Sequence, residues 1–281
     1  MKFAYKIIKP VIALLAAFAL TNCASTPKAP QFAKLYQANL QYYQGSPFKH
    51  AVFVNPAAFS KQTDHTHNKL LHVYIEGDGL PFIDPKTAAL DPSPETPLML
   101  KLMQMDKNPS IYLGRPCYFD TNDKKCSPIW WTHNRYSETV VNSMLAVLKQ
   151  FEQQYDGFVV IGYSGGGTVA MLMSEHYKPI KMLVTLAGNL DSTEWTYANN
   201  FTPLMGSLNP ANRPSLDPKL IQLHYAAEDD EIIEADWIQS VAEKQSRAEF
   251  HILKEMDHTC CWETFWPTAL KKLSQYRAFT R

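Results

Sequence analysis

Short runs of apolar residues, each bounded by polar or turn-forming residues, recur along the whole chain. Most are four to six residues long and rich in β-branched and aromatic side chains, which favours strands over helices. The pattern predicts eight strands, at residues 40–43, 51–54, 70–75, 110–113, 158–161, 182–186, 220–225 and 250–253.

Longer segments carry apolar residues at helical spacing. Between residues 137 and 155, Val141, Met144, Leu145 and Leu148 would share one face of a helix. Because strands and helices alternate through the second half of the chain, we expect an α/β fold with a mostly parallel sheet covered by helices on both faces. Helices are predicted at residues 137–155, 168–177, 234–245 and 263–279.

The amino-terminal segment follows a different pattern. Lys2, Lys6 and Lys9 precede ten consecutive apolar residues, 11–20. This run is too short to span a bilayer and is typical of the core of a signal peptide. We therefore predict a signal peptide over residues 1–22.

The residues that end this segment, Leu20-Thr21-Asn22-Cys23, resemble the cleavage box of bacterial lipoproteins. The resemblance implies that Cys23 becomes the lipidated first residue of the mature protein, and Ala24 after it resembles the signal for the outer membrane. An ordinary secretory signal is the alternative. Residues 23–34, with several Ser, Thr and Pro residues, are predicted to be a short flexible tether. We thus expect an exported protein of the cell envelope, held by its lipid in the outer membrane and facing the periplasm.

Composition limits the classes of protein that this chain could belong to. The chain has 281 residues, of which 46% are hydrophobic and 19% charged, which suits one globular domain, predicted over residues 35–281. Its 27 basic residues balance its 27 acidic residues, and there is no basic stripe. Binding to nucleic acid therefore has no electrostatic support.

Export changes the interpretation of the cysteines. Four remain besides Cys23, and an even number in an oxidising compartment indicates disulfides. Cys117 and Cys126 bracket a polar loop, and we favour a bond between them. Cys260 and Cys261 would then be free or joined as a neighbouring pair. A zinc site is not expected, because no C-x-x-C is present and the two groups lie far apart in sequence.

The candidate chemistry centres on Gly162-Tyr163-Ser164-Gly165-Gly166, which follows the predicted strand 158–161 and precedes the predicted helix 168–177. In a G-x-S-x-G elbow, the glycines allow a sharp turn that lifts the serine hydroxyl off the strand, and the N–H groups of the helix can hold an oxyanion. A glycine-rich turn with an ordinary serine is the alternative. Eight strands with this elbow after the fifth resemble the α/β-hydrolase fold over nearly all of the mature chain.

The resemblance implies a catalytic triad in the order serine, acid, histidine. Ser164 is the implied nucleophile. Asp230, after the predicted strand 220–225, fits the family register for the acid, with Asp229 second and Glu228 third as alternatives. His258, between the last predicted strand and the last predicted helix, is the implied base. A serine hydroxyl needs such a base, and the base needs a group that orients it.

An oxyanion hole needs two hydrogen-bond donors. The residue after the nucleophile, Gly165, is expected to supply one backbone N–H. The loop Glu76-Gly77-Asp78-Gly79 resembles the His-Gly-x loop of the family, with glutamate in place of the histidine. By that register Asp78 donates the second backbone N–H, with Gly79 as the alternative. The two glycines could also simply make a turn.

Several motifs together look like a group of exported bacterial α/β-hydrolase proteins that is defined by sequence rather than by a known substrate. The position after the sixth strand carries lids or caps in this fold, so residues 188–218 are predicted to form a cap-like insertion. No cofactor is implied, because the elbow lacks the G-x-G-x-x-G register and the P-loop lysine. The motifs are Glu76-Gly77-Asp78-Gly79, Arg115-Pro116-Cys117, the serine elbow, Ala187-Gly188-Asn189-Leu190-Asp191 and His258-Thr259-Cys260-Cys261-Trp262.

These features predict a serine hydrolase that cleaves carboxylic esters through an acyl-enzyme. Its substrate would be a small-molecule ester or a related acyl compound. An acyltransferase or an amidase could use the same triad. A non-catalytic envelope protein that binds ligands on the hydrolase scaffold is the alternative from another class.

Overall fold

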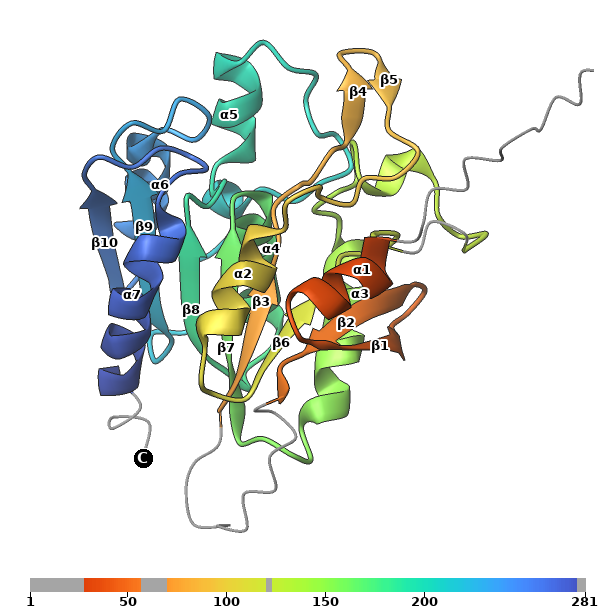
Figure 1. Cartoon of the computed structure of the whole chain (residues 1–281). Coiled ribbons are helices and arrows are strands. Elements are labelled where there is room, and N and C mark those ends of the chain that lie inside the picture. The colour runs from red at the N-terminus through yellow and green to blue at the C-terminus, as the bar shows by residue number, and fades with distance from the viewer. Residues whose placement is uncertain (1–27, 57–69, 120–122, 277–281) are drawn as a thin grey trace, which may run out of the picture.

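An eight-stranded sheet runs through the middle of the protein (Figure 1). The computed structural model describes residues 28–56, 70–119 and 123–276, so the predicted signal peptide, Cys23 and the start of the predicted tether lie outside the described residues. In spatial order, the strands are β1 (Asn39–Gln44), β2 (Lys49–Val54), β6 (Ser110–Leu113), β3 (Leu70–Ile75), β7 (Gly157–Tyr163), β8 (Ile180–Leu186), β9 (Ile221–Ala227) and β10 (Ala248–Leu253).

The sheet is mostly parallel. Strand β2 pairs antiparallel with both β1 and β6, and every other neighbouring pair is parallel. Strands β3 and β7 lie at the centre and are buried along their whole length, as their continuous apolar sequences require. All eight predicted strands are present within a few residues of their predicted bounds, and the predicted fold class is confirmed.

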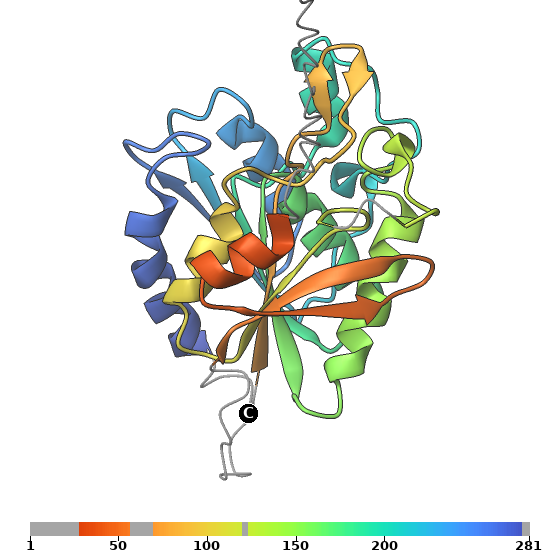
Figure 2. The ribbon, with the colours of Figure 1, turned by 45° about the vertical axis from the view of Figure 1, so that its right-hand side comes forward.

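Helices cover both faces of the sheet (Figure 2). One face carries α1 (Lys28–Leu35), α2 (Leu98–Met105) and α7 (Trp262–Tyr276). The other carries α3 (Glu138–Leu148), α4 (Gly165–His176) and α6 (Ala235–Ala242). The remaining elements are α5 (Ser192–Ala198), the short 3-10 helices η2 (Pro128–Trp130), η3 (Lys149–Phe151) and η4 (Pro210–Asn212), and a hairpin of β4 (Phe82–Asp84) and β5 (Thr87–Ala88).

The predicted tether is too long at its carboxyl end. Residues 28–34 belong to α1, where Ala29 is fully buried and Phe32 packs against the core. The polar and proline-rich composition suggested a tether, but these apolar side chains give the segment a helix face to bury. Any tether therefore ends by Lys28.

The carboxyl ends of the parallel strands form the edge at which α5 and the β4–β5 hairpin lie, at the top of Figure 1. No helix in the described ranges is long and apolar enough to cross a membrane.

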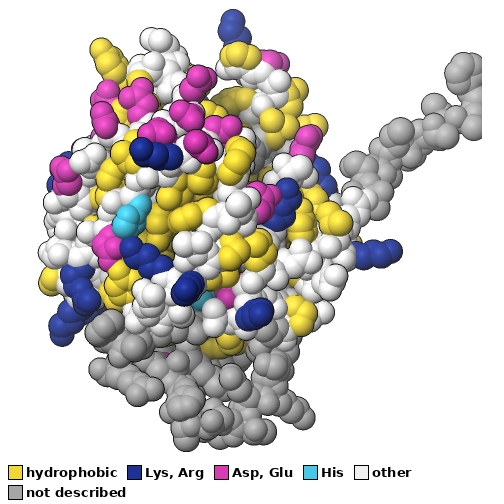
Figure 3. All heavy atoms as spheres, turned by 60° about the vertical axis from the view of Figure 1, so that its left-hand side comes forward, with side chains coloured by type: hydrophobic (Ala, Val, Ile, Leu, Met, Phe, Trp, Pro, Cys, Tyr) yellow, Lys and Arg dark blue, Asp and Glu magenta, His cyan; other side chains and the backbone are white. Residues whose placement is uncertain are grey.

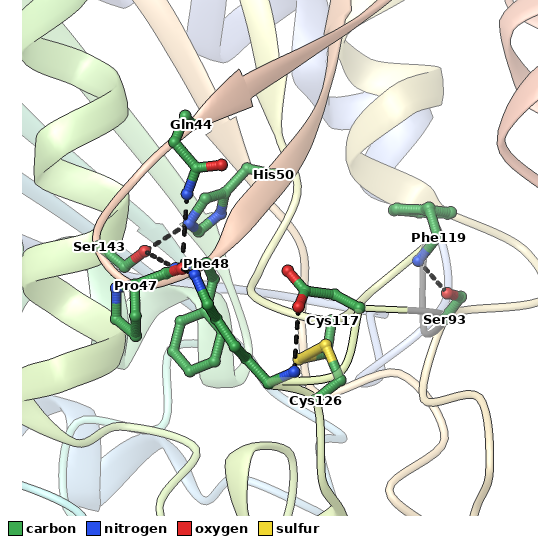
Figure 4. The surroundings of a disulfide bond; sticks show 11 residues. Gln44, Pro47, Phe48, His50, Ser93, Cys117, Phe119, Cys126 and Ser143 are labelled. Atoms are coloured by element: carbon green, nitrogen blue, oxygen red, sulfur yellow. Dashed lines mark hydrogen bonds between the residues drawn. A yellow bond between two sulfur atoms is a disulfide. The ribbon is translucent and has the colours of Figure 1, made fainter.

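The predicted disulfide between Cys117 and Cys126 is present, with 5.5 Å between its Cα atoms. Figure 4 shows it beside the turn between β1 and β2, where the Nζ of Lys125 donates to the carbonyl oxygen of Pro47 at 3.0 Å. Cys260 and Cys261 are joined to each other, which was one of the two arrangements left open by the sequence.

Candidate active site

Ser164 lies in the sharp turn between β7 and α4. Its φ of 51° and ψ of −124° place a non-glycine residue in the left-handed region, the strained turn expected of a nucleophile elbow. The turn is possible because Gly162 and Gly166 lack side chains: a Cβ at Gly162 would collide with the Gly166 carbonyl oxygen, and one at Gly166 with that of Ile75. The serine hydroxyl is thereby held clear of the strand end.

The structure brings Ser164, His258 and Asp230 together from three separate segments. His258 Nε2 lies 3.1 Å from Ser164 Oγ, and His258 Nδ1 lies 2.8 Å from Asp230 Oδ2. The histidine follows β10 and the aspartate follows β9, so parallel pairing of these strands delivers both residues to the same edge of the sheet. This is the serine–base–carboxylate arrangement that acyl transfer requires.

Only one carboxylate of the acidic loop after β9 turns inward. Asp230 is 7% exposed, and its other oxygen, Oδ1, accepts hydrogen bonds from the backbone N–H groups of Ile232 and Ile233 at 2.9 Å. Glu228 and Asp229, the alternatives that the sequence left open, are exposed to solvent. Figure 3 shows acidic side chains gathered along this end of the molecule.

Two aromatic residues hold the histidine loop in place. The hydroxyl of Tyr163 and the indole Nε1 of Trp262 each donate to the carbonyl oxygen of His258 at 2.8 Å. The Tyr163 ring also packs on the imidazole, with 5.2 Å between the ring centroids. Tyr163 is the variable residue of the G-x-S-x-G motif, so sequence reasoning gave it no role.

The two predicted oxyanion donors lie on either side of the elbow. Gly165 is the first residue of α4, so its N–H has no acceptor within the helix. Asp78 follows β3, and the described residues supply no acceptor for its backbone N–H either. Gly77 faces the nucleophile, because a Cβ there would lie 3.3 Å from Ser164 Cβ.

The pKa values of two carboxyl groups in this loop, those of Glu76 and Asp78, are shifted far from their usual values. Burial raises the pKa of Glu76 to about 7, although the N–H groups of Met99 and Gly77 partly offset it. For Asp78, burial acts in the same direction, but the charges of Arg135 and Arg115 outweigh it and hold the pKa of that carboxyl well below its usual range. The loop therefore combines one carboxyl that titrates near neutrality with one that stays ionised.

The triad opens into a cavity of about 980 Å³. Ser164 and His258 line it, as do Trp195, Phe201 and Leu204 from the predicted cap-like segment 188–218. The β4–β5 hairpin, which the sequence did not predict, supplies Phe82. Polar and charged side chains, among them Lys101 and Arg135, also line it, and a cavity of this size suits a small organic ligand.

No group of three or more His, Cys, Asp or Glu side chains in the described residues is placed to hold a metal ion. No family model matches the chain, and no curated protein matches it.

Solved structures nevertheless share the arrangement of strands and helices. A proline iminopeptidase of Mycobacterium smegmatis superposes with a TM-score of 0.60 at 11% identity, covering 86% of this chain and all of its own. An esterase of Pyrococcus furiosus matches with a TM-score of 0.55 at 12% identity, covering 87% of this chain and 93% of the esterase. The protein has the α/β-hydrolase fold.

A third structure with the α/β-hydrolase fold is similar over its full length. This is the mouse α/β-hydrolase domain-containing protein 10, with a TM-score of 0.59 and 12% identity over 87% of this chain. At such low identity the likeness concerns the fold alone, so the chemistry of the site must be argued from its own residues.

Proposed function

We propose that this protein is a serine hydrolase that cleaves carboxylic esters. The observation that carries the proposal is the hydrogen-bonded chain from Ser164 Oγ through His258 to Asp230, at 3.1 Å and 2.8 Å, on a strained elbow at the wall of a cavity. A glycine-rich turn without catalytic purpose would have no reason to hold a serine at positive φ beside an oriented imidazole.

The proposed reaction has two acyl-transfer steps. Ser164 Oγ attacks the ester carbonyl carbon while His258 Nε2 accepts the hydroxyl proton, and the Asp230 carboxylate orients the imidazolium through Nδ1. The tetrahedral oxyanion accepts hydrogen bonds from the backbone N–H groups of Gly165 and Asp78. His258 then protonates the leaving alcohol. Water attacks the acyl-enzyme with the same assistance and releases the acid.

The walls of the cavity favour an acyl group with an apolar chain. Trp195, Phe201 and Leu204 line it, and Phe82 comes from the hairpin. Removing an apolar chain from water against such side chains is favourable by roughly 25 cal/mol per Å² of buried surface. We therefore expect esters with medium-length acyl chains to be cleaved better than acetate.

Hydrolysis of p-nitrophenyl esters from acetate to decanoate tests the proposal. We expect release of p-nitrophenol by the wild-type protein, and a loss of kcat by about 10⁴- to 10⁶-fold in the Ser164→Ala variant, as in other enzymes that lose a triad nucleophile. Circular dichroism and a thermal melt of both proteins serve as the control for folding.

The same samples separate the alternatives. Labelling of the wild type, but not of Ser164→Ala, by a fluorophosphonate probe would show an activated serine even where the ester is a poor substrate. Turnover in Ser164→Ala equal to that of the wild type would contradict the proposal. An acyltransferase would instead give a transferred ester in place of free acid when an alcohol is supplied.

A further inference from the structure

The side chain of Asp78, which is 17% exposed and lines the cavity, lies at the centre of an ionic cluster with two buried arginines. Its Oδ1 accepts a hydrogen bond from Arg115 Nη1 at 2.5 Å, and its Oδ2 accepts from Arg135 Nη1 at 2.8 Å and from the Tyr136 hydroxyl at 2.6 Å. Arg115 is 1% exposed and Arg135 4% exposed. These four residues are called the Asp78 cluster below.

The cluster also holds the backbone of the loop. The Tyr118 hydroxyl donates to the carbonyl oxygen of Asp78 at 2.6 Å, and Arg115 Nη1 approaches the carbonyl oxygen of Gly77 at 3.4 Å. The Nη2 of Arg115 donates to the carbonyl oxygen of Arg135 at 2.8 Å, which ties the two arginines together. Side chain and backbone of Asp78 are thus both fixed by groups from distant parts of the chain.

The same cluster touches the serine elbow. A Cβ on Gly165 would collide with Asp78 Oδ1 and would lie 2.5 Å from the Tyr136 hydroxyl oxygen. The cluster therefore packs directly against the residue that carries the other predicted oxyanion donor. The contacts of the Asp78 cluster therefore fix the distance between the loop that holds Asp78 and the first turn of α4.

This arrangement is costly for stability alone. Burying two guanidinium groups with a single carboxylate carries a large desolvation penalty, and apolar residues of similar volume often stabilise a core as well or better. The cluster also leaves an excess of one positive charge beside the elbow, because Asp78 carries one negative charge against two positive ones. A positive charge near the site of a developing oxyanion lowers the energy of the transition state.

We propose that Asp78, Arg115, Arg135 and Tyr136 are positioning residues that set the oxyanion hole, by locking the Asp78 and Gly165 backbone N–H groups at their working separation. This inference rests on the proposed ester hydrolase. It makes the side chain of Asp78 important for turnover although it takes no part in proton transfer. Besides the elbow and the triad, the proposed reaction would then require a third structural feature, the contacts that residues 115, 135 and 136 make with Asp78.

The Asp78→Asn variant tests the proposal. The asparagine amide has the same size as the carboxylate, but its NH₂ group would face donors from which a carboxylate oxygen accepts in the wild type. The loop must therefore shift. We expect kcat for a p-nitrophenyl ester to fall by about 10²-fold, the loss seen when an oxyanion donor is removed, with KM within about threefold of the wild type. The inhibition constant of a trifluoromethyl ketone, which forms a tetrahedral oxyanion on the serine, should rise by the same factor.

Asp106 offers a matched control. It is also a buried carboxylate, 3% exposed, which lies 2.5 Å from His72 Nδ1 and accepts from the Tyr74 hydroxyl at 2.7 Å. It follows the carboxyl end of α2, whereas Glu76 beside the active site accepts from the amino end of α2. We expect both Asp106→Asn and Asp78→Asn to lower the melting temperature, but Asp106→Asn to leave kcat and ketone affinity within about threefold of the wild type.

A milder variant covers the case in which Asp78→Asn does not fold. Tyr136→Phe removes one hydrogen bond and should lower kcat by about tenfold. A folded Asp78→Asn or Tyr136→Phe protein with wild-type kcat and ketone affinity would overturn the inference, as would an equal loss in Asp106→Asn. Failure of the proposed function is distinguishable, because wild type and Ser164→Ala would then show the same turnover in this assay.

Discussion

Glu76 is a buried carboxyl group directly after the carboxyl end of β3. It is 4% exposed, and its Oε2 accepts the N–H of Met99 at the amino end of α2 at 3.0 Å. Burial raises its pKa from 4.5 to about 7. The folded protein therefore holds this proton more tightly than the unfolded chain does, and Glu76 links folding to pH in the neutral range.

The sign of the effect follows from the direction of the shift. A raised carboxyl pKa favours the folded state below about pH 4.5, and this advantage is lost as the pH rises through about 7. A shift of this size corresponds to about 3 kcal/mol. Glu76→Gln keeps an acceptor for the Met99 N–H and cannot ionise. Its free energy of unfolding should therefore not show the loss of about 3 kcal/mol that this carboxyl group causes as the pH rises.

Urea unfolding of wild type and Glu76→Gln from pH 4.5 to 8 measures the difference. We expect the stability of the variant relative to the wild type to increase with pH, by up to about 3 kcal/mol over this range. Glu95→Gln, at an exposed position in the loop before α2, is the control and should show no such trend. A constant difference between Glu76→Gln and wild type would show that Glu76 does not titrate in this range.

The residues of the predicted triad could be found from the sequence because each follows a recognisable strand. Ser164 stands in a local motif, and Asp230 and His258 follow the next strands that end at the same edge. Arg135 and Tyr136 could not be found in this way. They reach Asp78 from 57 and 58 residues away, and no spacing along the chain encodes a contact that depends on the folded sheet.

At the scale of elements, α5 and the β4–β5 hairpin both contribute residues to the wall of the cavity. Phe201 follows α5, lines the cavity, is 52% exposed, and packs against Trp195 with 5.2 Å between ring centroids. Such a half-exposed aromatic side chain can cover an acyl chain without being needed for the core. It is therefore a good position at which to separate substrate binding from stability.

Phe201→Ala should reduce kcat/KM for p-nitrophenyl decanoate by about tenfold, because part of the apolar contact to a long chain is lost. The acetate ester has no long chain to lose such a contact, and we expect it to be cleaved within about twofold of the wild-type rate. Tyr197→Ala is the control, since Tyr197 on α5 is 80% exposed and does not line this cavity. Equal losses for both esters would mean that Phe201 acts on the triad rather than on the acyl chain.

The elements that the sequence missed have physical reasons. Segment α2, LMLKLMQM, is only eight residues long, and its two polar residues, Lys101 and Gln104, are too few to establish a helical period in the sequence. The β4–β5 hairpin has strands of three and two residues, too short for an alternating pattern. Both lie next to the active site, so the sequence predicted the sheet better than it predicted the walls of the cavity.

At the scale of the whole molecule, the two disulfides agree with an oxidising compartment, as export would provide.

The chain enters the fold on the side of the cavity. The Nζ of Lys28, the first residue of α1, donates to the carbonyl oxygen of Ser93 at 3.3 Å and lies 3.4 Å from Asp91 Oδ2. Asp91 and Ser93 belong to the loop that continues to the cavity residue Pro94. Cys23 and Lys28 are five positions apart in the sequence, which limits the distance between them to about 18 Å.

We propose that Cys23 carries a lipid that holds the protein in the outer membrane. Each buried CH₂ group of an acyl chain contributes about 0.8 kcal/mol to membrane binding. In cells given labelled palmitate, we expect the wild type to carry the label and to sediment with outer membranes. Cys23→Ser should lose both properties, and Ala24→Asp should keep the label but move to the inner membrane. A Cys23→Ser protein that still carries the label, or an unlabelled and soluble wild type, would contradict lipid anchoring and favour an ordinary secretory signal.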